Sequence, residues 1–263
     1  STGNTIRGNY IGTDASGTVA MPNRFGIFQR NSTSTIGGTA AGAGNLISGN
    51  AQEGIRFESG NGNTVQGNYV GTNAAGTAAL GNGNLGIWVS TSNNLIGGTT
   101  AAARNVVSGN PNNHGIYFDG SGTNTVQGNY VGTNAAGTGA IPNRWGIVLR
   151  ANGNLIGGTA AGTGNVISGN NDGGIYAEGD SNTYQGNYIG INAAGTGALG
   201  NVGNGIQFGF SFDNTIGSTT AGGGNVISGN GVDGIRSENS GRNTYLGNYI
   251  GTNAAGTAAV GNA

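Results

Sequence analysis

Apolar and polar residues alternate in short segments that begin with a Gly-Ile pair. In the segment 116–119, apolar Ile116 and Phe118 alternate with Tyr117 and Asp119. Side chains of a strand point alternately to opposite faces, so Ile116 and Phe118 should face a core. The isoleucine of the pair recurs every 28 to 32 residues, at Ile27, Ile55, Ile87, Ile116, Ile147, Ile175, Ile206 and Ile235. This self-similarity predicts a repeat unit of about 30 residues.

Each unit contains two further segments with strand character, and both open with asparagine. The second segment has the form Asn-Thr/Leu-x, as in 124–126, and the third has the form Asn-x-Val/Ile, as in 129–131. Turns rich in glycine and asparagine separate the segments, and no apolar stripe of period 3.6 is long enough for a helix. The sequence therefore predicts an all-β fold with three short strands per unit.

Two versions of the unit alternate along the chain. A Gly-Asn-Tyr motif recurs every 58 to 61 residues, beginning at Gly8, Gly67, Gly128, Gly186 and Gly247. A long loop follows the third segment in one version, and an eight-residue loop such as 157–164 separates the second from the third in the other. This alternation gives a 60-residue double repeat. A single unit cannot bury its apolar side alone, so the units should stack into a solenoid. We predict a parallel β-helix of about nine coils, roughly 43 Å long at a strand spacing of ~4.8 Å.

The asparagines that open the second and third segments recur at a fixed offset in nearly every unit. A carboxamide both donates and accepts hydrogen bonds, so stacked copies can bond to one another and to the turn backbone. The alternative is that these residues only form turns, and the fixed offset disfavours it. We therefore expect two buried ladders, with Asn63, Asn94, Asn124 and Asn154 in one and Asn105, Asn129, Asn165 and Asn187 in the other.

The composition narrows the classes of protein that remain. Glycine fills 59 of the 263 residues, and charged residues make up only 7% of the chain, against about 25% in an ordinary globular domain. The net charge is −1 and all nine basic residues are arginine, which argues against a nucleic-acid partner. Cysteine is absent, which excludes a disulfide framework and a thiolate metal site. No apolar run is long enough for insertion into a membrane.

The Gly-Ile strands and the Asn-opened strands together resemble the right-handed parallel β-helix of the pectin-lyase-like superfamily, in particular the repeat proteins of large bacterial surface and secreted polypeptides. The resemblance covers essentially the whole chain. It implies a right-handed coil and an extracellular or cell-surface location. It implies no single activity, because the superfamily includes lyases, hydrolases, epimerases, adhesins and phage tailspikes.

The outward positions of the first strand form the most chemically varied face of the predicted solenoid. One row carries aromatic rings that can stack on sugars, and the next carries acids and a hydrogen-bonding arginine. The candidate glycan-binding face consists of Trp88, Tyr117, Asp119, Arg150, Tyr176 and Glu178. A stripe of tyrosines that includes Tyr130 is a second candidate, although packing against the long loops is the interpretation we favour.

Two acids of this face invite a hydrolase hypothesis. Asp119 and Glu178 lie two coils apart, hence roughly 9.6 Å, near the upper limit of ~6.5–9.5 Å for an inverting pair of carboxyl groups. Arg150 stands on the coil between them, so an opposite-charge ladder is the interpretation we favour. His114 is the only histidine, lysine is absent, and we interpret His114 as a turn residue before Gly115. We therefore expect no catalytic residue, no metal and no cofactor.

These features favour a non-enzymatic structural or adhesin-like extracellular segment, acting as a rigid spacer or fibre. A polysaccharide-binding or polysaccharide-processing β-helix is the alternative. Ice binding by an array of threonines is a third hypothesis. Ile191 interrupts that array and so disfavours it. The regularity of the repeat supports the first hypothesis, since an enzyme usually breaks its repeat around the active site.

The whole chain, 1–263, is expected to be a single β-helix domain and a fragment of a longer array. The sequence begins and ends within a coil, and neither end carries the charge, helix or proline that usually covers an exposed strand edge. We therefore expect end-to-end self-association of the solenoid.

Overall fold

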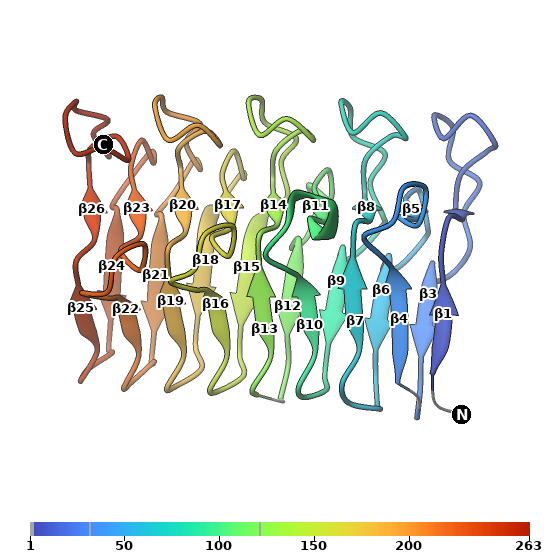
Figure 1. The fold of residues 1–263 in the computed structure, drawn as a ribbon, viewed down its shortest axis with the longest axis horizontal. Coiled ribbons are helices and arrows are strands. Elements are labelled where there is room, and N and C mark those ends of the chain that lie inside the picture. The colour runs from blue at the N-terminus through green and yellow to red at the C-terminus, as the bar shows by residue number, and fades with distance from the viewer. Residues whose placement is uncertain (1–2, 32, 121) are drawn as a thin grey trace.

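The fold is a parallel β-solenoid, as the repeat predicts. A computed structural model describes residues 3–31, 33–120 and 122–263. Each coil gives one strand to each of three parallel sheets, and the coils follow one another along the long axis of the molecule (Figure 1). Two sheets have nine strands and the third has eight, close to the nine coils expected.

The three sheets correspond to the three predicted segments. Sheet 1, built from the Gly-Ile segments, consists of β3 (Ile27–Gln29), β6 (Ile55–Phe57), β9 (Ile87–Val89), β12 (Ile116–Phe118), β15 (Trp145–Leu149), β18 (Gly173–Ala177), β21 (Ile206–Gly209) and β24 (Ile235–Glu238). Sheet 2 consists of β1 (Asn4–Ile6), β4 (Ser34–Gly37), β7 (Thr64–Gln66), β10 (Leu95–Gly97), β13 (Thr125–Gln127), β16 (Leu155–Gly157), β19 (Thr183–Gln185), β22 (Thr215–Gly217) and β25 (Thr244–Leu246). Sheet 3 consists of β2 (Tyr10–Ile11), β5 (Leu46–Ile47), β8 (Tyr69–Val70), β11 (Val106–Val107), β14 (Tyr130–Val131), β17 (Val166–Ile167), β20 (Tyr188–Ile189), β23 (Val226–Ile227) and β26 (Tyr249–Ile250). One 3₁₀ helix, η1 (Ala101–Ala103), lies in the loop before β11.

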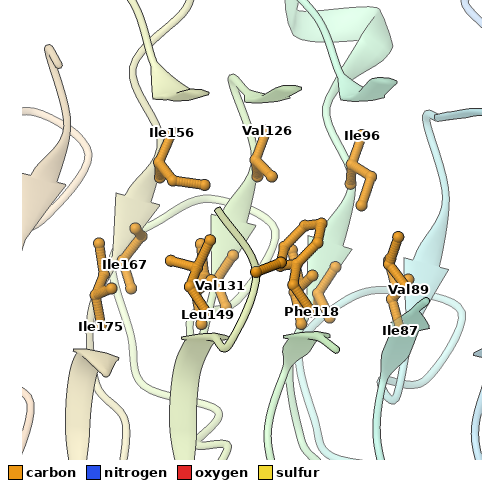
Figure 2. Packing of buried hydrophobic residues seen from close by; sticks show 14 of the residues in the cluster. Ile87, Val89, Ile96, Phe118, Val126, Val131, Leu149, Ile156, Ile167 and Ile175 are labelled. Atoms are coloured by element: carbon orange, nitrogen blue, oxygen red, sulfur yellow. The ribbon is translucent and has the colours of Figure 1, made fainter. Parts of the chain in front are cut away.

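Stacked aliphatic side chains fill the interior. Ile116 pairs in register with Ile87 on one side and Ile147 on the other. In the same way Val131 pairs with Ile167, and all of these side chains are fully buried. Figure 2 shows the labelled side chains of the three sheets meeting in one core. Complete burial stabilises by roughly 1.5–3 kcal/mol per large aliphatic group, so the core depends on contacts between neighbouring coils.

Glycine and isoleucine of the Gly-Ile pair both face the core. A β-carbon added to Gly115 would lie 2.7 Å from the carbonyl oxygen of Gly146 and 2.9 Å from Cγ1 of Val131. Only glycine fits at this position, because the next coil and the core occupy the space. Two consecutive inward positions shift the alternation by one residue, so the residue before the glycine returns to the outer face of sheet 1.

Both predicted asparagine ladders are present. Asn94 illustrates the pattern, since its backbone N–H and its Nδ2 both donate to Oδ1 of Asn124 in the next coil, at 3.0 and 2.7 Å. Equivalent bonds join the other members of the first ladder, Asn63 to Asn94, Asn124 to Asn154, and Asn154 onward to Asn182. The second ladder likewise joins Asn105, Asn129, Asn165 and Asn187.

A third ladder, which the sequence analysis did not identify, precedes sheet 1. Its side chains bond in the order Asn50, Asn82, Asn110, Asn143, Asn170, Asn201, Asn230 and Asn262. In alternate coils its asparagine follows Ser-Gly or ends the long loop, so no single motif marks it. Like the other two ladders, it satisfies turn backbone that would otherwise be buried without partners.

The long loops bond to one another across every second coil. The backbone N–H of Ala135 donates to the carbonyl oxygen of Gly76 at 2.9 Å, and Ala193 donates to Gly137 in the same way. These loops project along one edge of the solenoid beside sheet 3 (Figure 1). The 60-residue double repeat thus reflects a second set of hydrogen bonds, which links alternate coils.

Candidate functional site

A groove crosses the outer face of sheet 1 over five consecutive coils, and we call it the sheet 1 groove. Its volume is about 550 Å³. Five of the six residues predicted for a glycan-binding face lie in it, and Glu178 contacts it through Arg150. The groove is lined by Glu53, Asn84, Leu85, Trp88, Asn113, His114, Tyr117, Asp119, Arg144, Trp145, Val148, Arg150 and Tyr176.

Aromatic rings supply much of the groove surface. The rings of His114 and Tyr117 stack at a centroid distance of 5.9 Å and an angle of 23°. The rings of Trp145 and Tyr176 lie 5.3 Å apart at 45°. Glycine at position 173, next to Trp145 in the adjacent coil, leaves room for the indole, because a β-carbon there would overlap it. Grouped rings of this kind offer large apolar faces with polar edges.

The arginines along the groove are paired with acids of neighbouring coils. Arg150 Nε lies 2.6 Å from Glu178 Oε2, and the hydroxyl of Tyr176 donates to Glu178 Oε1 at 2.9 Å. Burial, together with this hydrogen bond, raises the pKa of Tyr176. Arg144 forms a second pair with Asp172 at 2.6 Å. Both arginines of the groove therefore already have an acidic partner.

The expected three-residue charge ladder is only half formed. Arg150 pairs with Glu178, but among the described residues it forms no ion pair with Asp119. Instead, Arg150 Nη1 donates to the hydroxyl of Tyr117 at 3.4 Å, so the guanidinium is directed toward Tyr117. Arg30 and Glu58, in two consecutive coils nearer the N-terminus, do form an ion pair.

A chain of amide hydrogen bonds forms one wall of the groove. Asn84 Nδ2 donates to Glu53 Oε1 at 2.6 Å, and Asn113 Nδ2 donates to Asn84 Oδ1. The backbone N–H of His114 donates to Asn113 Oδ1 at 3.0 Å. Burial, with the positive charges of Arg144 and Arg150 nearby, lowers the pKa of His114 to about 4. The imidazole is therefore neutral at physiological pH.

The groove residues that the sequence analysis did not assign to the face include Glu53, His114 and Trp145. Each stands immediately before the glycine of a Gly-Ile pair. Strict alternation from the isoleucine would turn these residues inward, whereas the inward glycine places them outside. His114 lies between a turn at 111–112 and β12, and it also lines the groove. The recurring position before Gly-Ile is the signal that would have identified all three.

The tyrosine stripe beside sheet 3 packs against the long loops. A β-carbon added to Gly137 would lie 2.8 Å from Cε2 of Tyr130, so the loop backbone covers that ring. Arg104 covers it as well, with its guanidinium carbon 4.0 Å from the ring centroid. A cavity of about 780 Å³ lies here, lined largely by glycine and alanine together with Tyr130, Tyr188 and Tyr249. The loop-packing interpretation therefore holds for Tyr130.

Within residues 3–31, 33–120 and 122–263, no three histidine, aspartate or glutamate side chains gather where they could hold a metal ion. The described part of the chain also has no helix long and apolar enough to cross a membrane. Fold and site together define a parallel β-solenoid with an aromatic groove on one sheet. No family model, curated protein or solved structure matches the chain.

Proposed function

We propose that this chain is a non-enzymatic, adhesin-like β-solenoid and that the sheet 1 groove binds a polysaccharide. One observation carries the proposal: both tryptophans of the chain, Trp88 and Trp145, lie in the same groove with Tyr117 and Tyr176. Large aromatic side chains on an exposed face are unusual unless they bind something, since they leave apolar surface in water.

The groove suits an extended chain of sugars. It spans five coils, and the four intervals between them at ~4.8 Å give roughly 19 Å of length, enough for several sugar rings. The apolar faces of sugars can lie on the ring pairs His114–Tyr117 and Trp145–Tyr176 while their hydroxyls reach the polar wall. The stacked sheets hold these rings on a rigid scaffold, which lowers the entropic cost of binding.

The surroundings of Asp119 and Glu178, the two acids of the hydrolase hypothesis, support binding without cleavage by that pair. Glu178 is engaged by Arg150 and by the hydroxyl of Tyr176, whereas Asp119 lies exposed on the groove. A glycosidase needs two carboxyl groups whose surroundings move their pKa values apart, so that one is held protonated in an apolar site and the other stays ionised. Neither side chain has such surroundings, so we assign both to the rim of a binding groove.

The location is part of the same proposal. The resemblance to surface and secreted repeat proteins supports an extracellular or cell-surface role. The continuous sheets and the three asparagine ladders support the role of a rigid spacer that carries the groove at a distance from the cell surface.

A glycan array probed with the wild type and two variants tests this function. Trp145→Ala removes an indole from the groove and should weaken binding of every glycan retained by the wild type by at least about tenfold. Phe28→Ala is the matched control, because Phe28 is an exposed aromatic residue of sheet 1 outside the groove. An array without any bound glycan, or equal losses in the two variants, would refute the proposal.

A further inference from the structure

Three buried polar atoms at one end of the sheet 1 groove have no hydrogen-bond partner among the described residues. They are Glu53 Oε2, Trp88 Nε1 and His114 Nδ1. The three residues come from consecutive coils, and Glu53 is only 3% exposed. Buried polar groups in folded proteins almost always have partners, and the exceptions gather where a ligand binds. Three such atoms lining one groove point to a hydrogen-bonding ligand.

The surrounding network holds these atoms in place. Glu53 Oε1 is fixed by Asn84, and Asn84 is fixed in turn by Asn113. The indole of Trp88 is held from one side by Arg56, whose guanidinium carbon lies 3.7 Å from the ring centroid. Glu53 Oε2 and the indole N–H of Trp88 are therefore held in place on the groove, each without a hydrogen-bond partner among the described residues.

The charges around the groove disfavour an anionic ligand. Arg144 and Arg150 are already paired with Asp172 and Glu178. Arg56 lies between Glu53 and Glu58, with nitrogen–oxygen distances of 3.9 and 3.3 Å. The carboxylates of Glu53 and Asp119 line the groove itself. Each of these three arginines already faces a carboxylate of the protein, which weakens its attraction for the carboxylate of an acidic sugar.

We infer that the groove selects an uncharged saccharide, whose hydroxyls bond to Glu53 Oε2, Trp88 Nε1 and His114 Nδ1. A sugar hydroxyl both donates and accepts, so it can donate to the carboxylate and accept from the indole N–H. A uronic acid would instead bring its carboxylate toward Glu53, whose charge repels it. This inference rests on the proposed function and specifies its ligand class.

The test compares neutral with acidic oligosaccharides of equal length. Cellotetraose, xylotetraose, mannotetraose and the best neutral glycan of the array would be titrated against tetragalacturonate by calorimetry. We expect the best neutral glycan to bind the wild type at least about tenfold more tightly than the uronate.

Glu53→Gln should weaken binding of the neutral glycan about tenfold, because a hydrogen bond to a charged acceptor is replaced by a hydrogen bond to a neutral one. Glu58→Gln is the matched control, since Glu58 directly follows β6 in the same coil and lies outside the groove, and it should bind like the wild type.

A second variant keeps the test decisive if Glu53→Gln does not fold. Trp88→Phe retains a ring on the groove but removes the indole N–H, and it too should weaken the neutral glycan. Tighter binding of acidic than of neutral glycans by the wild type would overturn the inference and leave the proposed function intact. Unchanged binding by both variants would also overturn it. A complete absence of glycan binding would refute the proposed function itself.

Discussion

Asn129 donates two hydrogen bonds to the same oxygen of Asn165 in the next coil, one from its backbone N–H at 3.0 Å and one from its Nδ2 at 3.1 Å. Its Nδ2 also donates to the carbonyl oxygen of Ile96 in the preceding coil. One fully buried side chain thus connects three coils. The same pattern repeats in three ladders. The asparagine side chains, like the aliphatic core, therefore hold neighbouring coils together.

Replacement of this residue should be costly. Asn129→Ala leaves buried backbone groups without partners, which costs about 1–3 kcal/mol. Asn134→Ala is the control, since Asn134 lies in an exposed loop and bonds mainly to Thr138, and its loss should cost less than ~0.5 kcal/mol. Urea unfolding of the two variants measures the difference. Equal free energies of unfolding would remove the ladders from the account of stability.

Loss of the ion pair on the groove rim should have a small effect on stability. Arg150 is half exposed and pairs with Glu178, and exposed pairs contribute roughly 0–1 kcal/mol. Arg150→Ala should therefore lower the free energy of unfolding by no more than about 1 kcal/mol. A double-mutant cycle with Glu178→Ala isolates the coupling. A coupling well above that range would mean that the pair organises the groove and does not merely line it.

The tyrosine inside the core predicts a stabilising substitution. Tyr184 is fully buried in the core with its ring edge-to-face against Phe208, its hydroxyl has no partner among the described residues, and burial raises its pKa. Tyr184→Phe removes the unsatisfied hydroxyl and should raise the free energy of unfolding by about 1 kcal/mol. Tyr245→Phe is the control, because the hydroxyl of Tyr245 is bonded to Ser237 near the surface. A loss of stability in Tyr184→Phe would show that the hydroxyl has a partner, such as a buried water.

The histidine of the groove makes stability depend on pH. Burial, with the charges of Arg144 and Arg150, lowers the pKa of His114 to about 4, against ~6.5 in an unfolded chain. Between these pH values the unfolded chain binds a proton at His114 that the folded chain does not. The free energy of unfolding therefore has its full value above about pH 6.5 and decreases as the pH falls toward 4.

The pH dependence can be isolated with His114→Gln. We expect the wild type to lose about 1–2 kcal/mol more than this variant between pH 6.5 and 4.5, because solvent screening reduces the full linkage of ~1.4 kcal/mol per pH unit. Urea unfolding at several pH values gives both curves. Parallel curves would indicate that His114 titrates normally in the folded protein.

The sequence predicted the core and two ladders because both depend on position alone. Alternation placed Ile116 and Phe118 inward, and the fixed offset of Asn129 marked a stacked row. The sequence did not predict the wall of the groove that contains Glu53 and His114. Their outward placement depends on two consecutive inward residues in the Gly-Ile pair, which strict alternation does not allow.

The charge row shows a different kind of limit. Arg150 had an acid available on the coils to either side, and the structure pairs it with Glu178 and turns it from Asp119 toward Tyr117. Spacing makes both pairs equally plausible. The choice depends on the conformation of a long side chain against its aromatic neighbours, which a sequence does not specify.

Tryptophan fluorescence tests the central claim most directly, because Trp88 and Trp145 are the only tryptophans and both line the sheet 1 groove. The wild type would be titrated with the best neutral glycan of the array, alongside calorimetry at the same concentrations. The account predicts a saturable change in emission whose midpoint equals the calorimetric Kd, and whose size falls in Trp145→Ala. A glycan that binds by calorimetry without changing the emission would place the binding site elsewhere and contradict the account.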